Sequence, residues 1–150
     1  MTCANCVNTT ENQPAIDPTS FHLGVISAFS EVVSAGVKPL ALSHPLSSEE
    51  MALFLPEATK IAAKYNVELY LEKDLIITKL FPADVAKDKE VLLLYQGHTL
   101  NRYQAIKRDK AALEHHGLYK EQEAVDTAVR FGKLLGYSSK GIQKLIHENR

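Results

Sequence analysis

The sequence predicts a small α/β or α+β domain in which a sheet of three to four strands is covered by about five helices. Short apolar runs typical of strands alternate along the chain with longer segments whose apolar residues recur at helical spacing. The 150 residues match the usual size of one domain, and no internal repeat is present. We therefore expect a single globular domain over residues 20–150, preceded by an irregular, proline-containing arm over residues 1–19.

The first helix is expected to begin at Ser20 and to end where Gly36 and Pro39 interrupt the pattern. A short strand over residues 40–43 follows it. The next helix has a clear start signal, since Ser47 can cap it and Glu50, three residues later, completes a capping box. Pro56 lies inside this helix, where we expect a kink or a break.

Two further strands are predicted at residues 67–71 and 75–80, joined by the short polar stretch from Glu72 to Asp74. That spacing favours a hairpin at residues 67–80 within a mixed sheet. Residues 91–95 form a continuous apolar run, which predicts an interior strand without a solvent-exposed face.

The C-terminal third predicts three helices. One begins near Thr99 and is stopped by Gly117, and a second is broken by the pair Gly136-Tyr137. Ser138 can then cap a final short helix.

Composition excludes several classes of protein. Hydrophobic residues make up 45% and charged residues 23% of the chain, close to the average for soluble globular domains. No apolar run is long enough to span a membrane, and the first residues do not resemble a secretory signal, so we expect a cytoplasmic protein. The net charge of −1 does not favour nucleic-acid binding, and nearby glutamates dilute the basic residues between Arg102 and Lys120.

Polar side chains follow several of the predicted strands, where the carboxyl ends of parallel strands would bring them to one crevice. These candidate site residues are Ser43, His44, Glu72, Asp74, Gly97, His98, Thr99 and Arg102. His44 and His98 are the candidate acid–base groups, because a histidine changes charge near neutral pH. Arg102 and the glycine–helix junction at Gly97 suit an anion. Each has a structural alternative: a loop histidine, a solvated Glu-Lys-Asp turn, or a basic helix face.

Cys3 and Cys6 form a Cys-x-x-Cys pair, which is a candidate for metal binding or redox chemistry. Zinc usually needs about four ligands, and the chain has no other cysteine to supply a second pair. A redox pair would need a preceding strand, which the sequence before Cys3 is too short to form. A terminal segment without a site is the alternative, and no pattern identifies a cofactor.

Two hypotheses of function remain from the sequence. The first is a site for a small anionic ligand or a metal at the strand ends, with or without catalysis. The second is a protein-interaction or regulatory domain that forms homo-oligomers through its C-terminal helices, with Phe131, Leu134, Leu135 and Tyr137 as the apolar centre. Convergence of His44 and His98 on one crevice would favour the first.

Overall fold

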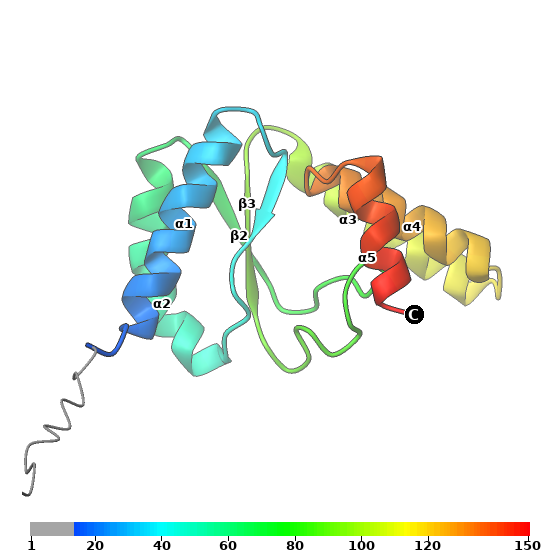
Figure 1. Ribbon diagram of the computed structural model, residues 1–150, viewed down its shortest axis with the longest axis horizontal. Helices are drawn as coiled ribbons and strands as arrows, with labels where there is room; N and C mark the ends of the chain where they lie inside the picture. The colour runs from blue at the N-terminus through cyan, green and yellow to red at the C-terminus, as the bar shows by residue number, and fades with distance from the viewer. Residues whose placement is uncertain (1–13) are drawn as a thin grey trace, which may run out of the picture.

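The computed structural model describes residues 14–150 and forms three layers, with a sheet between two groups of helices (Figure 1). In chain order the elements are α1 (Pro18–Ser34), β1 (Leu40–Leu42), α2 (Ser48–Ala63), β2 (Glu68–Glu72), β3 (Val91–Tyr95), α3 (Thr99–His115), α4 (Glu121–Leu134) and α5 (Ser139–Glu148). The predicted α+β class, with about five helices and three strands, is confirmed. None of the helices within residues 14–150 has the length and apolar character needed to cross a bilayer.

The strands are arranged in the order β1-β3-β2, and β3 is antiparallel to both neighbours. Leu40 pairs with Tyr95 on one side of β3, and Glu68 pairs with the same residue on the other side. The sheet is therefore antiparallel rather than mixed. Because both outer strands oppose β3, β1 and β2 run in the same direction, and their carboxyl ends lie at the same end of the sheet.

Side chains of β3 alternate between two apolar cores, as the period of a strand requires. Leu92 and Leu94 pack against α1 and α2, whereas Val91 and Leu93 pack against the layer formed by α3, α4 and α5. All four are buried, so the prediction of an interior strand at residues 91–95 is confirmed.

Local signals set the helix starts. Asp17 caps α1 through the backbone N–H of Ser20. Ser47 and Glu50 form the predicted capping box of α2, and Ser138 caps α5 through the N–H of Gly141. The helix α2 continues past Pro56, so of the two alternatives expected there, a kink or a break, the break is excluded.

Residues 75–80 do not form the predicted strand, and the hairpin at residues 67–80 is absent. Strand β2 pairs instead with β3, which follows only after the long connection of residues 73–90. Residues 75–80 remain irregular because side chains of α3 bond to their backbone. Tyr103 accepts a hydrogen bond from the N–H of Ile76, and Lys110 donates to the carbonyl of Ile77.

Candidate functional site: a pocket in the β2–β3 connection

The strand directions divide the predicted site residues into two groups. Ser43, His44, Glu72 and Asp74 lie at the end of the sheet where β1 and β2 finish, whereas Gly97, His98, Thr99 and Arg102 lie beyond the opposite end of β3. Five strand residues at about 3.4 Å each separate the two ends by about 17 Å. The predicted convergence of His44 and His98 on one crevice was therefore wrong, because β1 is antiparallel to β3.

Ser43 continues the pairing of β1 with β3. Its N–H donates to the carbonyl of Leu92, and its hydroxyl accepts from the N–H of the same residue at 2.8 Å. The hydroxyl also donates to the carbonyl of His44. The buried hydroxyl of Ser43 is therefore bonded to the backbone on both sides and has a structural role.

His44 stacks on His22 of α1. The ring centroids are 4.5 Å apart, and the planes are 15° from parallel. Partial burial, with the nearby His22 and Lys89, lowers the pKa of His44, and Glu50 opposes this shift. The stack joins α1 to the turn after β1, a tertiary contact that no sequence spacing reveals.

The stacked geometry does not suit a shared metal ion. Ring nitrogens coordinate in the plane of the imidazole, and two nearly parallel planes direct their lone pairs side by side rather than toward one point. Within residues 14–150 there is no group of three or more metal-ligating side chains. Cys3 and Cys6 lie outside the described residues.

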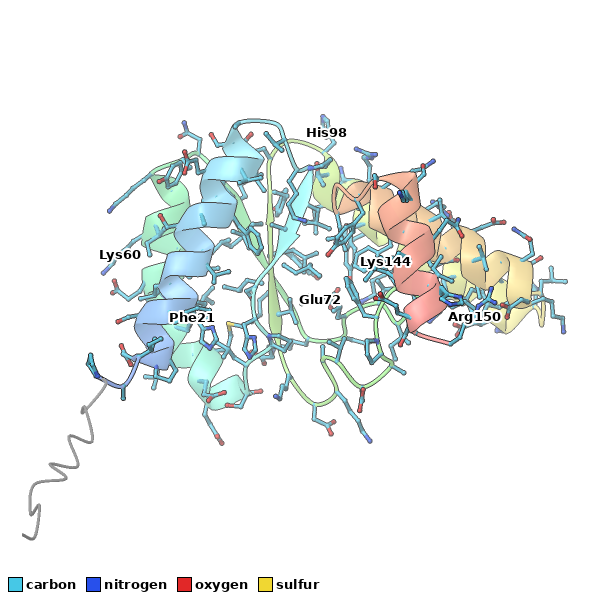
Figure 2. All side chains as sticks on the ribbon, in the orientation of Figure 1. Phe21, Lys60, Glu72, His98, Lys144 and Arg150 are labelled. Carbon is cyan, nitrogen blue, oxygen red and sulfur yellow. The ribbon has the colours of Figure 1, made fainter. Side chains whose placement is uncertain are left out.

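Glu72 is the centre of a buried polar network on the other face of the sheet (Figure 2). Its carboxylate accepts from the Tyr103 hydroxyl at 2.8 Å, from Lys107 Nζ at 3.0 Å and from the N–H of Asp74 at 2.9 Å. Burial raises the pKa of Tyr103, and the hydrogen bond to Glu72 raises it further. The hydroxyl of Tyr103 therefore remains a donor throughout the physiological range. The predicted pair of carboxylates at residues 72 and 74 is thus divided, with Glu72 inside and Asp74 exposed.

The network fixes the start of the connection between β2 and β3 against α3. In addition to its bond with Glu72, Lys107 donates to the carbonyl of Asp74 at 2.6 Å. Further along, the side chain of Asn149 donates to the carbonyls of Lys79 and Phe81, and the ring of Phe81 packs edge-on against Phe131. The connection is therefore anchored at several points to α3, α4 and the residue that follows α5.

A pocket of about 390 Å³ lies within this connection. Residues 73–78 form one wall, and residues 81–83 and 85–88 form the other; we call this cavity the loop pocket. Its lining is mixed: apolar side chains such as those of Ile76, Phe81 and Val85 contribute to it, and each wall adds one lysine and one aspartate. Asp74 is the one residue of the predicted site that lines it, and Glu72 lies directly behind its first wall.

At the opposite end of the sheet, Gly97 has a positive φ of 59°, which explains the glycine there. His98, not Thr99, is the cap residue of α3, and its side chain makes no capping hydrogen bond. Arg102 lines a groove of about 290 Å³ between α3 and α4, together with Arg130 and Lys133. These basic residues meet across two helices, which the sequence did not indicate.

The C-terminal helices do not present the apolar surface expected for an oligomer. Phe131, Leu134 and Leu135 are each at most 2% exposed and belong to the core of the single chain. Only Tyr137 of this group is exposed, and the ammonium of Lys38 lies over its ring.

Comparison with known proteins gives no relative from which a role could be transferred. No family model, curated protein or solved structure matches this chain.

Proposed function

We propose that the protein binds a small molecule in the loop pocket. The observation that carries the proposal is the combination of a cavity with both apolar and charged side chains and a first wall fixed by buried polar groups. The volume of about 390 Å³ falls in the range of about 300–1,000 Å³ that is usual for ligand sites. Walls held in place before binding reduce the ordering cost that a ligand must overcome.

Binding rather than catalysis is the activity we propose. The polar side chains that line the loop pocket are Lys73, Asp74, Thr78, Lys87 and Asp88. Within residues 14–150, no hydrogen bond joins two of them into a nucleophile and its base. The Tyr103 hydroxyl and the Glu72 carboxylate are bonded to each other and to the wall, which favours a supporting role for both.

A fragment screen by NMR tests this proposal. In ¹H–¹⁵N spectra of the full chain, we expect some apolar fragments at about 1 mM to shift the amide signals of residues 75–78 and 85–88. Ala83→Trp should fill the pocket from its rim and weaken these fragments at least about tenfold. Ala52→Trp is the matched control, since Ala52 is also exposed but lies on α2, across the sheet.

Two results would contradict small-molecule binding at this place. One is a screen in which no fragment shifts the signals of the pocket residues. The other is a set of fragments that bind Ala83→Trp and the unchanged protein equally well.

A second candidate is an anion site in the groove between α3 and α4. Arg102, Arg130 and Lys133 line this groove, and the nearby carboxylate of Asp109 pairs with Arg130 alone. Guanidinium groups suit phosphate and carboxylate groups. Titration with inorganic phosphate should shift signals around Arg102, and Arg102→Gln with Lys133→Gln should abolish the shift. Equal shifts in the double variant would exclude the groove.

A further inference from the structure

Residues 75–78 have a strand-forming sequence but pair with no strand among the described residues. The stretch Leu-Ile-Ile-Thr is rich in β-branched side chains, which is why the sequence predicts a strand there. In the structure the segment is irregular, although it lies directly after β2 and forms one wall of the loop pocket. Residues 75–78 thus have a strand-forming sequence and lie beside the loop pocket without a neighbouring strand among the described residues.

Part of the backbone in this wall is engaged by α3, and part has no protein partner. The N–H of Ile76 and the carbonyl of Ile77 are bonded to Tyr103 and Lys110. The N–H groups of Leu75, Ile77 and Thr78 donate to no other group within residues 14–150, and the carbonyls of Leu75, Ile76 and Thr78 accept from no donor there. Backbone polar groups need partners, and a ligand with its own amide can supply them.

The rim of the loop pocket carries balanced charges. Lys73 and Asp74 belong to the first wall, and Lys87 and Asp88 belong to the second. None of these four forms a salt bridge within the described part of the chain. The two aspartates of the rim repel an anionic ligand, and the two lysines repel a cationic one. A molecule with one charge of each sign therefore suits the rim best.

We propose that the ligand of the loop pocket is a short peptide with free termini and apolar side chains. Its backbone pairs with residues 75–78, in the manner of a strand added to an exposed edge. Its side chains enter the apolar lining, its carboxylate meets Lys73 or Lys87, and its ammonium meets Asp74 or Asp88. The modest volume favours two residues over a longer segment. This inference rests on the proposed function and names the chemical class of its ligand.

A series of ligands on the unchanged protein tests the inference without altering the fold. The probes are Leu-Leu, its counterpart methylated at the peptide nitrogen, and N-acetyl-Leu-Leu-amide, each titrated by NMR. We expect Leu-Leu to bind with a dissociation constant on the order of 0.1–1 mM. Methylation removes the amide donor and should weaken binding at least about fivefold. Capping both ends should weaken it about two- to fivefold for each exposed charge pair that is lost.

Substitutions of the charged rim residues test which end of the peptide each pair of charges contacts. Lys73→Gln with Lys87→Gln should reduce the affinity for Leu-Leu without reducing that for Leu-Leu-amide, because only the first ligand has a carboxylate. Asp74→Asn with Asp88→Asn should weaken Leu-Leu but not N-acetyl-Leu-Leu. Asparagine also tolerates the positive φ of 57° at residue 88.

Two outcomes would overturn the peptide assignment. One is binding of the capped or methylated peptides as tight as that of Leu-Leu. The other is a protein that binds apolar fragments in the loop pocket but no Leu-Leu, which would leave the proposed function intact and remove its peptide class. If neither fragments nor peptides shift the signals of residues 75–78, the site itself is refuted.

Discussion

A Cβ atom at Gly132 would lie 2.6 Å from Cγ1 of Ile142, so α4 and α5 approach each other closely at this glycine. Alanine normally stabilises a helix interior by about 1 kcal/mol relative to glycine. At residue 132 we expect the opposite, because overpacking of a buried contact costs about 1–3 kcal/mol. Gly132→Ala should lower the free energy of unfolding measured in urea.

Gly24 provides the control for this prediction. It also lies inside a helix, but a Cβ there would meet no group of residues 14–150 within 4 Å other than its own helix backbone and chain neighbours. Gly24→Ala should therefore leave stability unchanged or raise it. Equal effects at the two glycines would show that the contact with Ile142 relaxes without cost.

Tyr103→Phe should destabilise the protein by about 1–3 kcal/mol, because it removes one of the three hydrogen bonds to the buried carboxylate of Glu72 and leaves the N–H of Ile76 without an acceptor. The ring itself, which packs on Phe131, is retained. Tyr70→Phe is the control, since within residues 14–150 the hydroxyl of Tyr70 forms no hydrogen bond, and its effect should stay within about 0.5 kcal/mol. Chemical denaturation of both variants gives their free energies of unfolding. Similar losses in Tyr103→Phe and Tyr70→Phe would argue against a stabilising role of the Glu72 network.

The stack of His22 and His44 predicts a pH dependence. The pKa of His44 is lowered in the folded protein, so the unfolded chain binds more protons just below the ordinary value of about 6.5. Stability contributed by this residue is therefore present above pH 6.5 and is lost as the pH falls toward the lowered pKa. Melting temperatures between pH 7.5 and 5.5 should fall less steeply in His44→Phe, which keeps a stacked ring but cannot be protonated.

His98→Phe serves as the control for this pH effect. His98 is exposed beyond the opposite end of β3, away from the stack. Its replacement should leave the slope of melting temperature against pH as it is in the unchanged protein. A slope in His44→Phe that matches the unchanged protein would contradict a role for the histidine stack.

Leu93→Asp should abolish cooperative unfolding, because Leu93 is fully buried in the middle of the central strand. A carboxylate there has no partner in the apolar core. Leu53→Asp makes the same change on a side chain that is 84% exposed and should melt nearly as the unchanged protein does. A sharp, unshifted melting curve for Leu93→Asp would disprove the interior position.

The parts of the fold that could be predicted depend on neighbours in sequence. The capping box of Ser47 and Glu50 and the cap at Ser138 are local patterns, so the helix starts followed from the residues alone. The apolar run of residues 91–95 likewise identified the buried strand. The strand predicted at residues 75–80 was wrong, because strand propensity does not show which partner the backbone will find. Here Tyr103 and Lys110 of α3 bond to the backbone in place of a neighbouring strand.

The site was less accessible to sequence reasoning, because it depends on strand order and direction. A search for residues at strand ends did find Glu72 and Asp74, although it could not tell which carboxylate is buried. It grouped His44 with His98, since nothing local shows that β1 opposes β3. Nothing in the sequence paired His22 with His44, because the two rings meet only after the chain has folded.

The order of the strands bears on how the protein is made. The central strand β3 is the last of the three to leave the ribosome, and β1 and β2 both pair with it. Until residues 91–95 emerge, the two earlier strands lack their partner, and α1 and α2 lack Leu92 and Leu94 in their core. The nascent chain that precedes residue 91 thus carries unpaired strand edges and apolar surface, features that favour aggregation and attract chaperones. The sheet is completed only when β3 emerges, and the core on its other face waits for α3, α4 and α5, which follow β3 in the chain.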